Sequence, residues 1–249
     1  MWAQAKTTKA NLRGRIMSEL SPAEYEVITK RHYQDSDIAE RYRAEYAGPF
    51  QLRSIPARVV AMRERGIIHG AITDMVNAEP ARVRKVLDLP CGTGKLASVL
   101  GGFPFKIVAA DISREMMDAA AGDYMALSQF LGFIQADASA TRFEDKEFDL
   151  VVCLRLLHRV PDNVRIAILA ELCRITRKSF IISVGLTGGI QTLRQRARYL
   201  TTGVSTVPYP VTRKVFTKQM LDAGLKPRIW VPVLPLISSE WVVIGERSN

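Results

Sequence analysis

The sequence predicts an α/β fold with a doubly wound, mostly parallel sheet, preceded by a helical segment. Three observations lead to this prediction. From residue 83 onward, short apolar runs alternate with segments of helical periodicity, which is typical of βαβ units. Three of these runs end at or beside an aspartate, where a buried strand gives way to a loop. The first 80 residues lack such runs and carry helix start and stop signals instead.

The N-terminal part, residues 1–80, is predicted to be a helical arm or cap, separate from a domain over residues 81–249. A helix-start signature with serine, proline and glutamate begins at Ser21. A second short helix is expected at about residues 36–46. A longer one is expected over about residues 56–76, where apolar residues recur at helical spacing and form one stripe.

The middle of the chain supplies the parallel strands and the helices between them. Apolar runs predict five strands, at about residues 84–89, 106–111, 133–137, 148–154 and 179–184. Helices are expected over about residues 95–100, 113–131 and 162–176. This order of elements predicts helices on both faces of the sheet.

The C-terminal part departs from this alternation. Residues 187–211 are basic and rich in threonine, serine and proline, and we interpret them as an inserted lid. A helix over about residues 212–223 is expected to end at a glycine. Two strands at about residues 228–237 and 240–246 then close the fold.

Composition and charge limit the function classes. The hydrophobic fraction of 47% suits a globular protein, and no apolar run approaches the length of a membrane span. No secretory signal is visible, and three widely spaced cysteines predict neither a disulfide framework nor a zinc site, so a cytoplasmic location is expected. The net charge is +10, and residues 191–249 alone carry 9 basic and 3 acidic residues. Such a flank suits nucleic acid, an anionic membrane surface or an anionic substrate, or is simply a soluble basic surface.

The sharpest motif is a strand followed by a glycine-rich turn at residues 86–94, Val-Leu-Asp-Leu-Pro-Cys-Gly-Thr-Gly. Glycines let the backbone approach a ligand closely, and the next helix points its N-terminus at that ligand. Asp111 ends the following strand, where a carboxylate can accept both hydroxyls of a ribose. Asp137 follows the third strand, where it can accept a hydrogen bond from an exocyclic amine of a purine.

Two nucleoside cofactors fit this arrangement. Residues 92–97 also satisfy the dinucleotide pattern G-x-G-x-x-G/A, which by itself is weak. Asp88 favours the other cofactor, because a carboxylate beside the loop would repel a pyrophosphate. Together with Asp111 and Asp137 it forms an acidic rim. This rim suits S-adenosylmethionine (SAM), which carries an amine and a sulfonium, better than NAD.

The motifs resemble those of the class I SAM-dependent methyltransferases over about residues 83–246. Residues 86–94, 110–117, 135–138 and 148–154 look like the four motifs of this family, in order. The resemblance implies a seven-stranded sheet with an antiparallel last strand, SAM as cofactor with S-adenosylhomocysteine (SAH) as product, and no metal. The implied cofactor-binding residues are Asp88, Pro90, Cys91, Gly92, Gly94, Asp111, Ile112, Met116, Asp137, Ala138 and Leu154.

The candidate catalytic residue is His158, in the stretch after the fourth strand, since an imidazole can take a proton from a hydroxyl nucleophile. The alternative is that His158 only packs against the helix that follows. Arg155 is a candidate for holding an anionic substrate, and Tyr42 for covering the cofactor or substrate. The predicted function is methyl transfer to a small-molecule, glycan-linked or lipid-linked acceptor. An RNA-binding or RNA-modifying protein is the alternative, and a peripheral membrane contact stays open.

Overall fold

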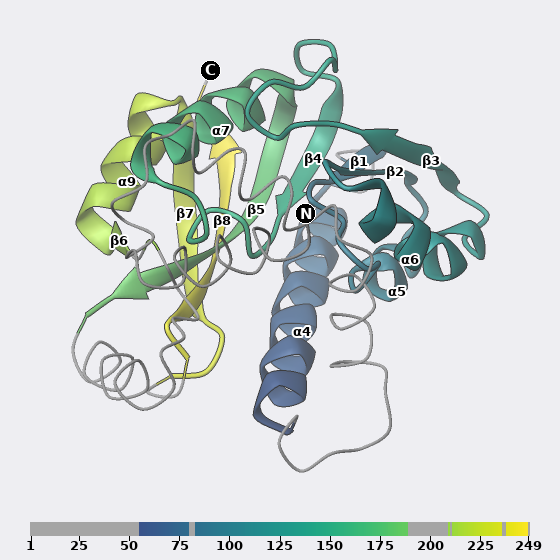
Figure 1. Ribbon diagram of the computed structural model, residues 1–249, viewed down its shortest axis with the longest axis horizontal. Helices are drawn as coiled ribbons and strands as arrows, with labels where there is room; N and C mark the ends of the chain where they lie inside the picture. The colour runs from purple at the N-terminus through teal and green to yellow at the C-terminus, as the bar shows by residue number, and fades with distance from the viewer. Residues whose placement is uncertain (1–54, 80–82, 189–208, 210, 236–237, 249) are drawn as a thin grey trace, which may run out of the picture.

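The computed structural model of the protein describes residues 55–79, 83–188, 209, 211–235 and 238–248 (Figure 1). It is built around one sheet whose strands follow the order β3-β2-β1-β4-β5-β8-β7. A short further strand, β6, pairs with β5 beside this path. The strands are β1 (Lys85–Asp88), β2 (Lys106–Asp111), β3 (Phe130–Gln135), β4 (Phe148–Cys153), β5 (Thr176–Thr187), β6 (Val211–Thr212), β7 (Leu225–Pro232) and β8 (Glu240–Arg247).

The strand directions confirm the predicted sheet. From β3 through β5, neighbouring strands pair in parallel. The last strand of the chain, β8, runs antiparallel to both β5 and β7. Seven strands therefore form the main path, as the family resemblance implies. The two-residue β6 was not predicted, because so short a segment has no periodicity to detect.

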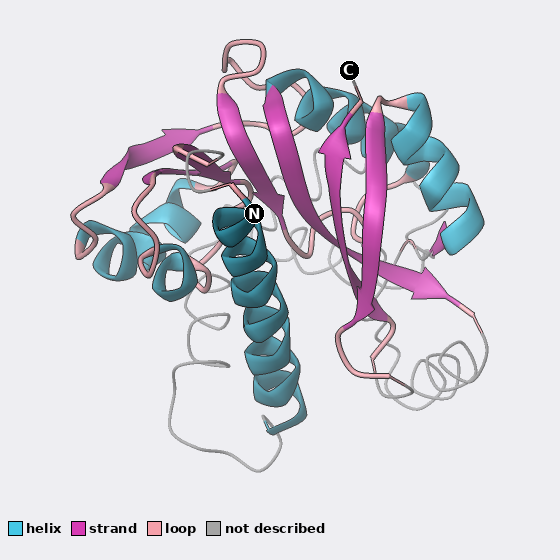
Figure 2. Ribbon diagram, turned by 180° about the vertical axis from the view of Figure 1, so that it is seen from behind, coloured by secondary structure: helices cyan, strands magenta, loops and turns pink. Residues whose placement is uncertain are grey.

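Helices cover both faces of the sheet, as expected for a doubly wound fold. The helices are α4 (Ile55–Ala78), α5 (Ala97–Leu100), α6 (Arg114–Met125), α7 (Asp162–Ile175) and α9 (Arg213–Asp222). One buried cluster joins α4, α5 and α6 to one face, and a second joins α7 and α9 to the other. Figure 1 shows the face covered by α7 and α9. Figure 2, the reverse view, shows the face covered by α4.

Alternating side chains along the strands supply these two cores. In β4, Leu150 and Val152 belong to the cluster under α4 to α6, whereas Val151 and Cys153 belong to the cluster under α7 and α9. All four side chains are essentially inaccessible to solvent. Burial on both faces explains why this strand appears in the sequence as a continuous apolar run.

The largest boundary errors lie around β3. The helix predicted to reach residue 131 ends at Met125, and β3 begins at Phe130, three residues before the predicted start. Several β3 side chains are exposed because β3 is an edge strand of the sheet, so its pattern is weak. Phe130 and Phe133 instead pack their rings on Tyr124 of α6, with ring centroids 5.2 and 5.6 Å from that of Tyr124.

Some predictions fall on parts of the chain outside the described residues. These are the two helices expected before residue 55, Tyr42, and most of the insertion expected at residues 187–211. The third N-terminal helix is confirmed as α4, in which Ile68 and Ile72 are fully buried. Among the helices that the structure describes, none has both the length and the apolar character required to cross a membrane.

Candidate functional site

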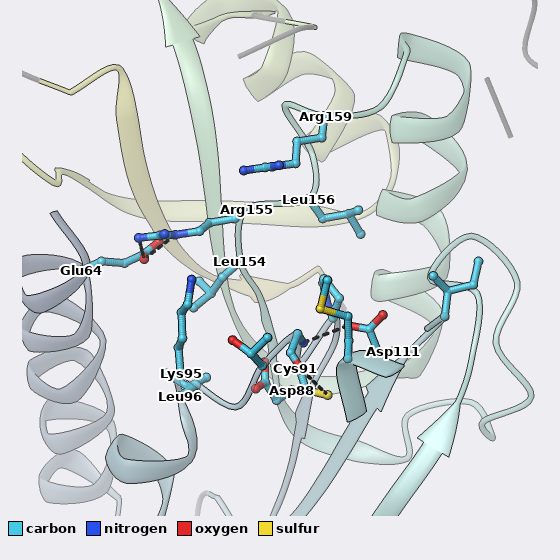
Figure 3. A pocket seen from close by; sticks show the side chains of 15 residues that line it. Glu64, Asp88, Cys91, Lys95, Leu96, Asp111, Leu154, Arg155, Leu156 and Arg159 are labelled. Carbon is cyan, nitrogen blue, oxygen red and sulfur yellow. Dashed lines mark hydrogen bonds and ion pairs between the residues drawn. The ribbon is translucent and has the colours of Figure 1, made fainter. Parts of the chain in front are cut away.

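A pocket of about 170 Å³ opens where β1, β2 and β4 reach their carboxyl ends (Figure 3). This edge is the usual ligand position in an open α/β sheet. The pocket combines apolar side chains with a few charged ones, as small-molecule sites generally do. Its lining residues are Glu64, Asp88, Pro90, Cys91, Gly92, Thr93, Lys95, Leu96, Asp111, Ile112, Met116, Leu154, Arg155, Leu156 and Arg159.

The pocket gathers many, but not all, of the residues predicted from the sequence. Those that line it are Asp88, Pro90, Cys91, Gly92, Asp111, Ile112, Met116, Leu154 and Arg155. Those that lie in the described chain but do not line it are Gly94, Asp137, Ala138 and His158.

The two glycines of the turn after β1 have different tasks. Both adopt left-handed backbone conformations, with φ of 51° at Gly92 and 81° at Gly94. A Cβ atom at Gly92 would meet nothing within 4 Å, so this position borders open space in the pocket. A Cβ atom at Gly94 would lie 3.1 Å from the Cβ atom of Ala120 on α6. Gly94 therefore allows the loop to pack against α6, and Gly92 leaves room for a ligand.

Asp111 connects this turn to the start of α6. Its Oδ2 atom accepts the backbone N–H of Gly92 at 2.8 Å, and its Oδ1 atom accepts that of Ser113 at 3.0 Å. Ser113 is in turn the N-cap of α6, accepting the backbone N–H of Met116. Burial raises the pKa of Asp111, and the backbone hydrogen bonds oppose that shift. The carboxylate thus holds the turn in shape while lining the pocket.

Asp88 lies deeper, with only 2% of its surface exposed. The hydroxyl of Tyr124 on α6 donates a short hydrogen bond to its Oδ2 atom. Burial raises the pKa of Asp88 to about 7, the Tyr124 bond lowers it, and the charge of Asp111 raises it further. Tyr124 was not predicted to belong to the site, because its only signal was an aromatic residue at a core position of a predicted helix.

Arg155 forms ion pairs with two acidic residues at the side of the pocket. It follows β4 in a left-handed conformation with φ of 57°, and its backbone N–H donates to Ser183. Its guanidinium Nη2 atom lies 2.6 Å from a carboxylate oxygen of Glu64 on α4, and its Nε atom lies 3.5 Å from Glu240 on β8. Neither acid was predicted to belong to the site, because each is distant from the motifs in sequence.

His158 lies behind the pocket wall, in the segment between β4 and α7. It is 5% exposed, and its Nδ1 atom has no hydrogen-bond partner among the described residues. Burial lowers the pKa of His158 to about 3, with further lowering by the charges of Arg159, Arg155 and Arg165. The imidazole is therefore neutral and a weak base near pH 7. The catalytic role suggested by the sequence stays a prediction.

Asp137 and Ala138 follow β3, outside the pocket lining. The Oδ1 atom of Asp137 accepts the backbone N–H of Ser139 at 2.9 Å and its hydroxyl at 2.7 Å. Ala138 is buried in the core cluster under α7 and α9. The carboxylate of Asp137 therefore stabilises a turn, and its role in reading a purine edge stays a prediction.

The side chains that line the pocket fit SAM. Carboxylates at the ends of β1 and β2 suit an ammonium group and ribose hydroxyls, and Ile112 and Met116 offer apolar surface to a purine ring. The open space at Gly92 permits close approach of a ligand to the backbone. For a metal, the described part of the chain contains no group of three or more potential His, Cys, Asp or Glu ligands.

Comparison with known proteins agrees with this geometry. Residues 86–179 match a protein family described as a methyltransferase domain. The matched residues run from β1 into β5 and include the glycine turn and Asp111.

A curated sequence relative is similar to part of the chain. The chain is 30% identical over 91 residues to a ubiquinone biosynthesis O-methyltransferase of Aliivibrio fischeri, covering 36% of this chain and 39% of that protein. The chain therefore matches well under half the length of that curated relative.

Two solved structures have the same fold over most of the chain. The magnesium protoporphyrin IX methyltransferase of Synechocystis with bound SAH has a TM-score of 0.72 at 16% identity, covering 90% of this chain and all of that one. The 1,6-didemethyltoxoflavin-N1-methyltransferase of Burkholderia thailandensis has a TM-score of 0.61 at 18% identity, covering 92% of each chain. At these identities the likeness establishes the fold of the methyltransferase domain.

Proposed function

We propose that this protein is a SAM-dependent methyltransferase that acts on a small-molecule acceptor. The observation that carries the proposal is the position of Asp111. Its carboxylate joins the glycine turn to α6 and lines the pocket inside the matched methyltransferase domain. A carboxylate has about four lone-pair sites, so the backbone donors of Gly92, Ile112 and Ser113 still leave it able to accept a ribose hydroxyl.

The proposed cofactor site assigns a task to each wall of the pocket. Asp111 holds the ribose, Ile112 and Met116 flank the adenine, and Asp88 and Gly92 face the methionine part. SAM supplies an electrophilic methyl group on its sulfonium sulfur. The chain itself positions the acceptor and excludes water, since positioning supplies most of the catalysis that such a displacement needs.

Three observations support a small-molecule acceptor. The pocket is small and largely apolar beyond its charged rim. The Aliivibrio relative and the two solved neighbours are named for ubiquinone biosynthesis, a protoporphyrin and a toxoflavin precursor. We keep the more specific proposal from the sequence, which is that the methyl acceptor is linked to a glycan or a lipid.

The position of a basic cluster argues against RNA as the methyl acceptor. Arg177, Lys178, Lys226, Arg228 and Arg247 border one surface hollow. Arg177 and Lys178 lie at the start of β5, and the pocket lies at the ends of the parallel β1, β2 and β4. The cluster therefore lies at the amino ends of the parallel strands, and the cofactor site lies at their carboxyl ends. A nucleic acid bound there would not bring a base to the pocket.

Equilibrium dialysis with radiolabelled SAM tests the cofactor site. Replacing Asp111 with alanine removes the proposed ribose acceptor and leaves donors unpaired, at a cost of about 1–3 kcal/mol. We expect SAM affinity to fall by roughly 10–100-fold. Asp118→Ala is the matched control, because Asp118 is exposed on α6 and does not line the pocket. Equal SAM affinity in the two variants would contradict the proposed site.

A further inference from the structure

Two carboxyl groups meet at one side of the pocket, on elements far apart in the sequence. Glu64 comes from α4 and Glu240 from the start of β8. Both pair with Arg155, and the Glu240 carboxylate also accepts the hydroxyl of Ser183 at 3.4 Å. The side chain of Glu64 is 5% exposed and that of Glu240 is 13% exposed, and Glu64 lines the pocket.

Arg155 is shared by the two carboxyl groups, and the pKa of Glu240 is raised. One Glu64 oxygen receives the Nε–H of Arg155 at 2.9 Å, whereas the other, Oε1, is buried without a hydrogen-bond partner among the described residues. Burial raises the pKa of Glu240 to about 7, and the charge of Glu64 raises it further. Arg155 and Arg159 lower that pKa. A carboxyl group whose pKa lies near 7 is protonated at acidic pH, so Glu240 is neutral there.

The pair lies across the pocket from the proposed ribose site. Figure 3 shows Glu64 and Arg155 on one side, Asp111 on the other, and Leu154 and Asp88 between them. If the nucleoside binds at Asp111, Glu64 faces the opposite end, where an acceptor would enter. A buried carboxylate at that end has the chemistry to take a proton.

We propose, on the basis of the proposed methyltransferase function, that Glu64 is the general base for a hydroxyl acceptor and that Glu240 helps to position it through Arg155. The hydroxyl oxygen forms a bond to the methyl carbon, and the carbon–sulfur bond breaks with its electron pair left on sulfur. The hydroxyl proton passes to the Glu64 carboxylate. Arg155 holds both carboxylates in place and is already neutralised by them, so it is poorly suited to bind an anionic substrate.

The protonation state of the pair is tested without any acceptor. Glutamate side-chain carboxyl carbons are labelled with carbon-13 in the full chain saturated with SAH, and followed by NMR as pH changes. Glu64→Gln and Glu240→Gln assign the two signals. We expect Glu240 to release its proton near pH 7, and Glu64→Gln to move the Glu240 titration to lower pH, because the charge of Glu64 raises the pKa of Glu240. Ionisation of Glu240 below about pH 5 would overturn its place in the proposal.

The catalytic role is tested with labelled SAM and a panel of phenols, catechols, alcohols and sugars, each beside its methyl ether. We expect transfer to a hydroxyl compound but not to its ether. Glu64→Gln should lower kcat by roughly 10²–10⁴ with little change in KM or in SAM affinity. Glu240→Gln should lower kcat less than Glu64→Gln does, because Glu240 contacts Arg155 and does not line the pocket.

Each other result has a distinct meaning. Weaker SAM binding by Glu64→Gln at unchanged kcat would mean that Glu64 holds the cofactor, and would overturn the proposal. So would a protein that binds SAM but methylates no hydroxyl compound in the panel. Failure of folded wild-type protein to bind SAM or SAH would instead overturn the proposed function itself.

Two further variants control for folding. Glu79→Gln is the matched control, because Glu79 follows α4 and is 55% exposed. It should retain wild-type kcat. Glu64→Asp keeps the charge but withdraws the carboxylate by one methylene, so it should keep the Arg155 ion pair better than Glu64→Gln while remaining slow. Full kcat in Glu64→Asp and in Glu64→Gln together would overturn the role of Glu64.

Discussion

Substitution of Gly94 by alanine should destabilise the protein more than the same change at Gly92. At Gly94 the residue adopts φ of 81°, which costs an L-residue about 1–2 kcal/mol. The new methyl group would lie 3.1 Å from the Cβ atom of Ala120 and 3.2 Å from the Oδ2 atom of Asp123. Such overpacking costs about 1–3 kcal/mol. Reduced freedom of the unfolded chain offsets about 0.4–1 kcal/mol of this, so a net loss of roughly 1–4.5 kcal/mol is expected.

Gly92→Ala is the matched control for this change. Its φ of 51° is also left-handed, but a Cβ atom there meets nothing within 4 Å. We expect a loss of about 1 kcal/mol or less in the absence of ligand. Urea unfolding of both variants without SAM, with the transition midpoint compared at an unchanged slope, measures the difference. Equal losses, or a larger loss at Gly92, would refute the argument that Gly94 serves helix packing.

Three further changes test the electrostatics of the site. Tyr124→Phe removes the donor to Asp88, so we expect a loss of about 1–3 kcal/mol in unfolding free energy above pH 7 and a smaller loss at acidic pH, measured by urea unfolding. The raised pKa of Asp88, about 7, means that the folded state binds more protons than the unfolded state between about pH 4 and 7. Its contribution to stability therefore falls as pH rises through that window, and Asp88→Asn should flatten this part of the Tm–pH profile; an unchanged slope would contradict the assignment. His158→Ala should lower Tm with turnover per folded molecule little changed, whereas a fall of roughly 10²–10⁴ would identify His158 as the base in place of Glu64.

The sequence predicted the parallel part of the fold well where both faces of a strand are buried. The boundaries of β2 were predicted at residues 106–111, and Ser113 was predicted as the cap of the helix that follows. Both depend on local signals: a continuous apolar run, a terminal aspartate and a capping serine. The edge strand β3 was misplaced because half-exposed positions weaken the apolar pattern.

The candidate site could be predicted only where its residues belong to a local motif. The glycine turn and Asp111 are of this kind, and they meet in the pocket. Glu64 was not predicted, because its contact with Arg155 joins residues 91 positions apart. The bond from Tyr124 to Asp88 likewise joins α6 to β1 through the core. Such contacts depend on how helices pack on the sheet, which periodicity alone does not determine.

Titration calorimetry of the wild-type chain with SAM, SAH and NAD tests the central claim most directly. The fit of the pocket to an adenosine nucleoside beside Asp88 and Asp111 predicts that SAM and SAH each bind at one site per chain. NAD should bind far more weakly, because its pyrophosphate would meet the acidic rim. Absence of heat with SAM and SAH from protein that unfolds cooperatively on heating, or tight binding of NAD alone, would contradict the account.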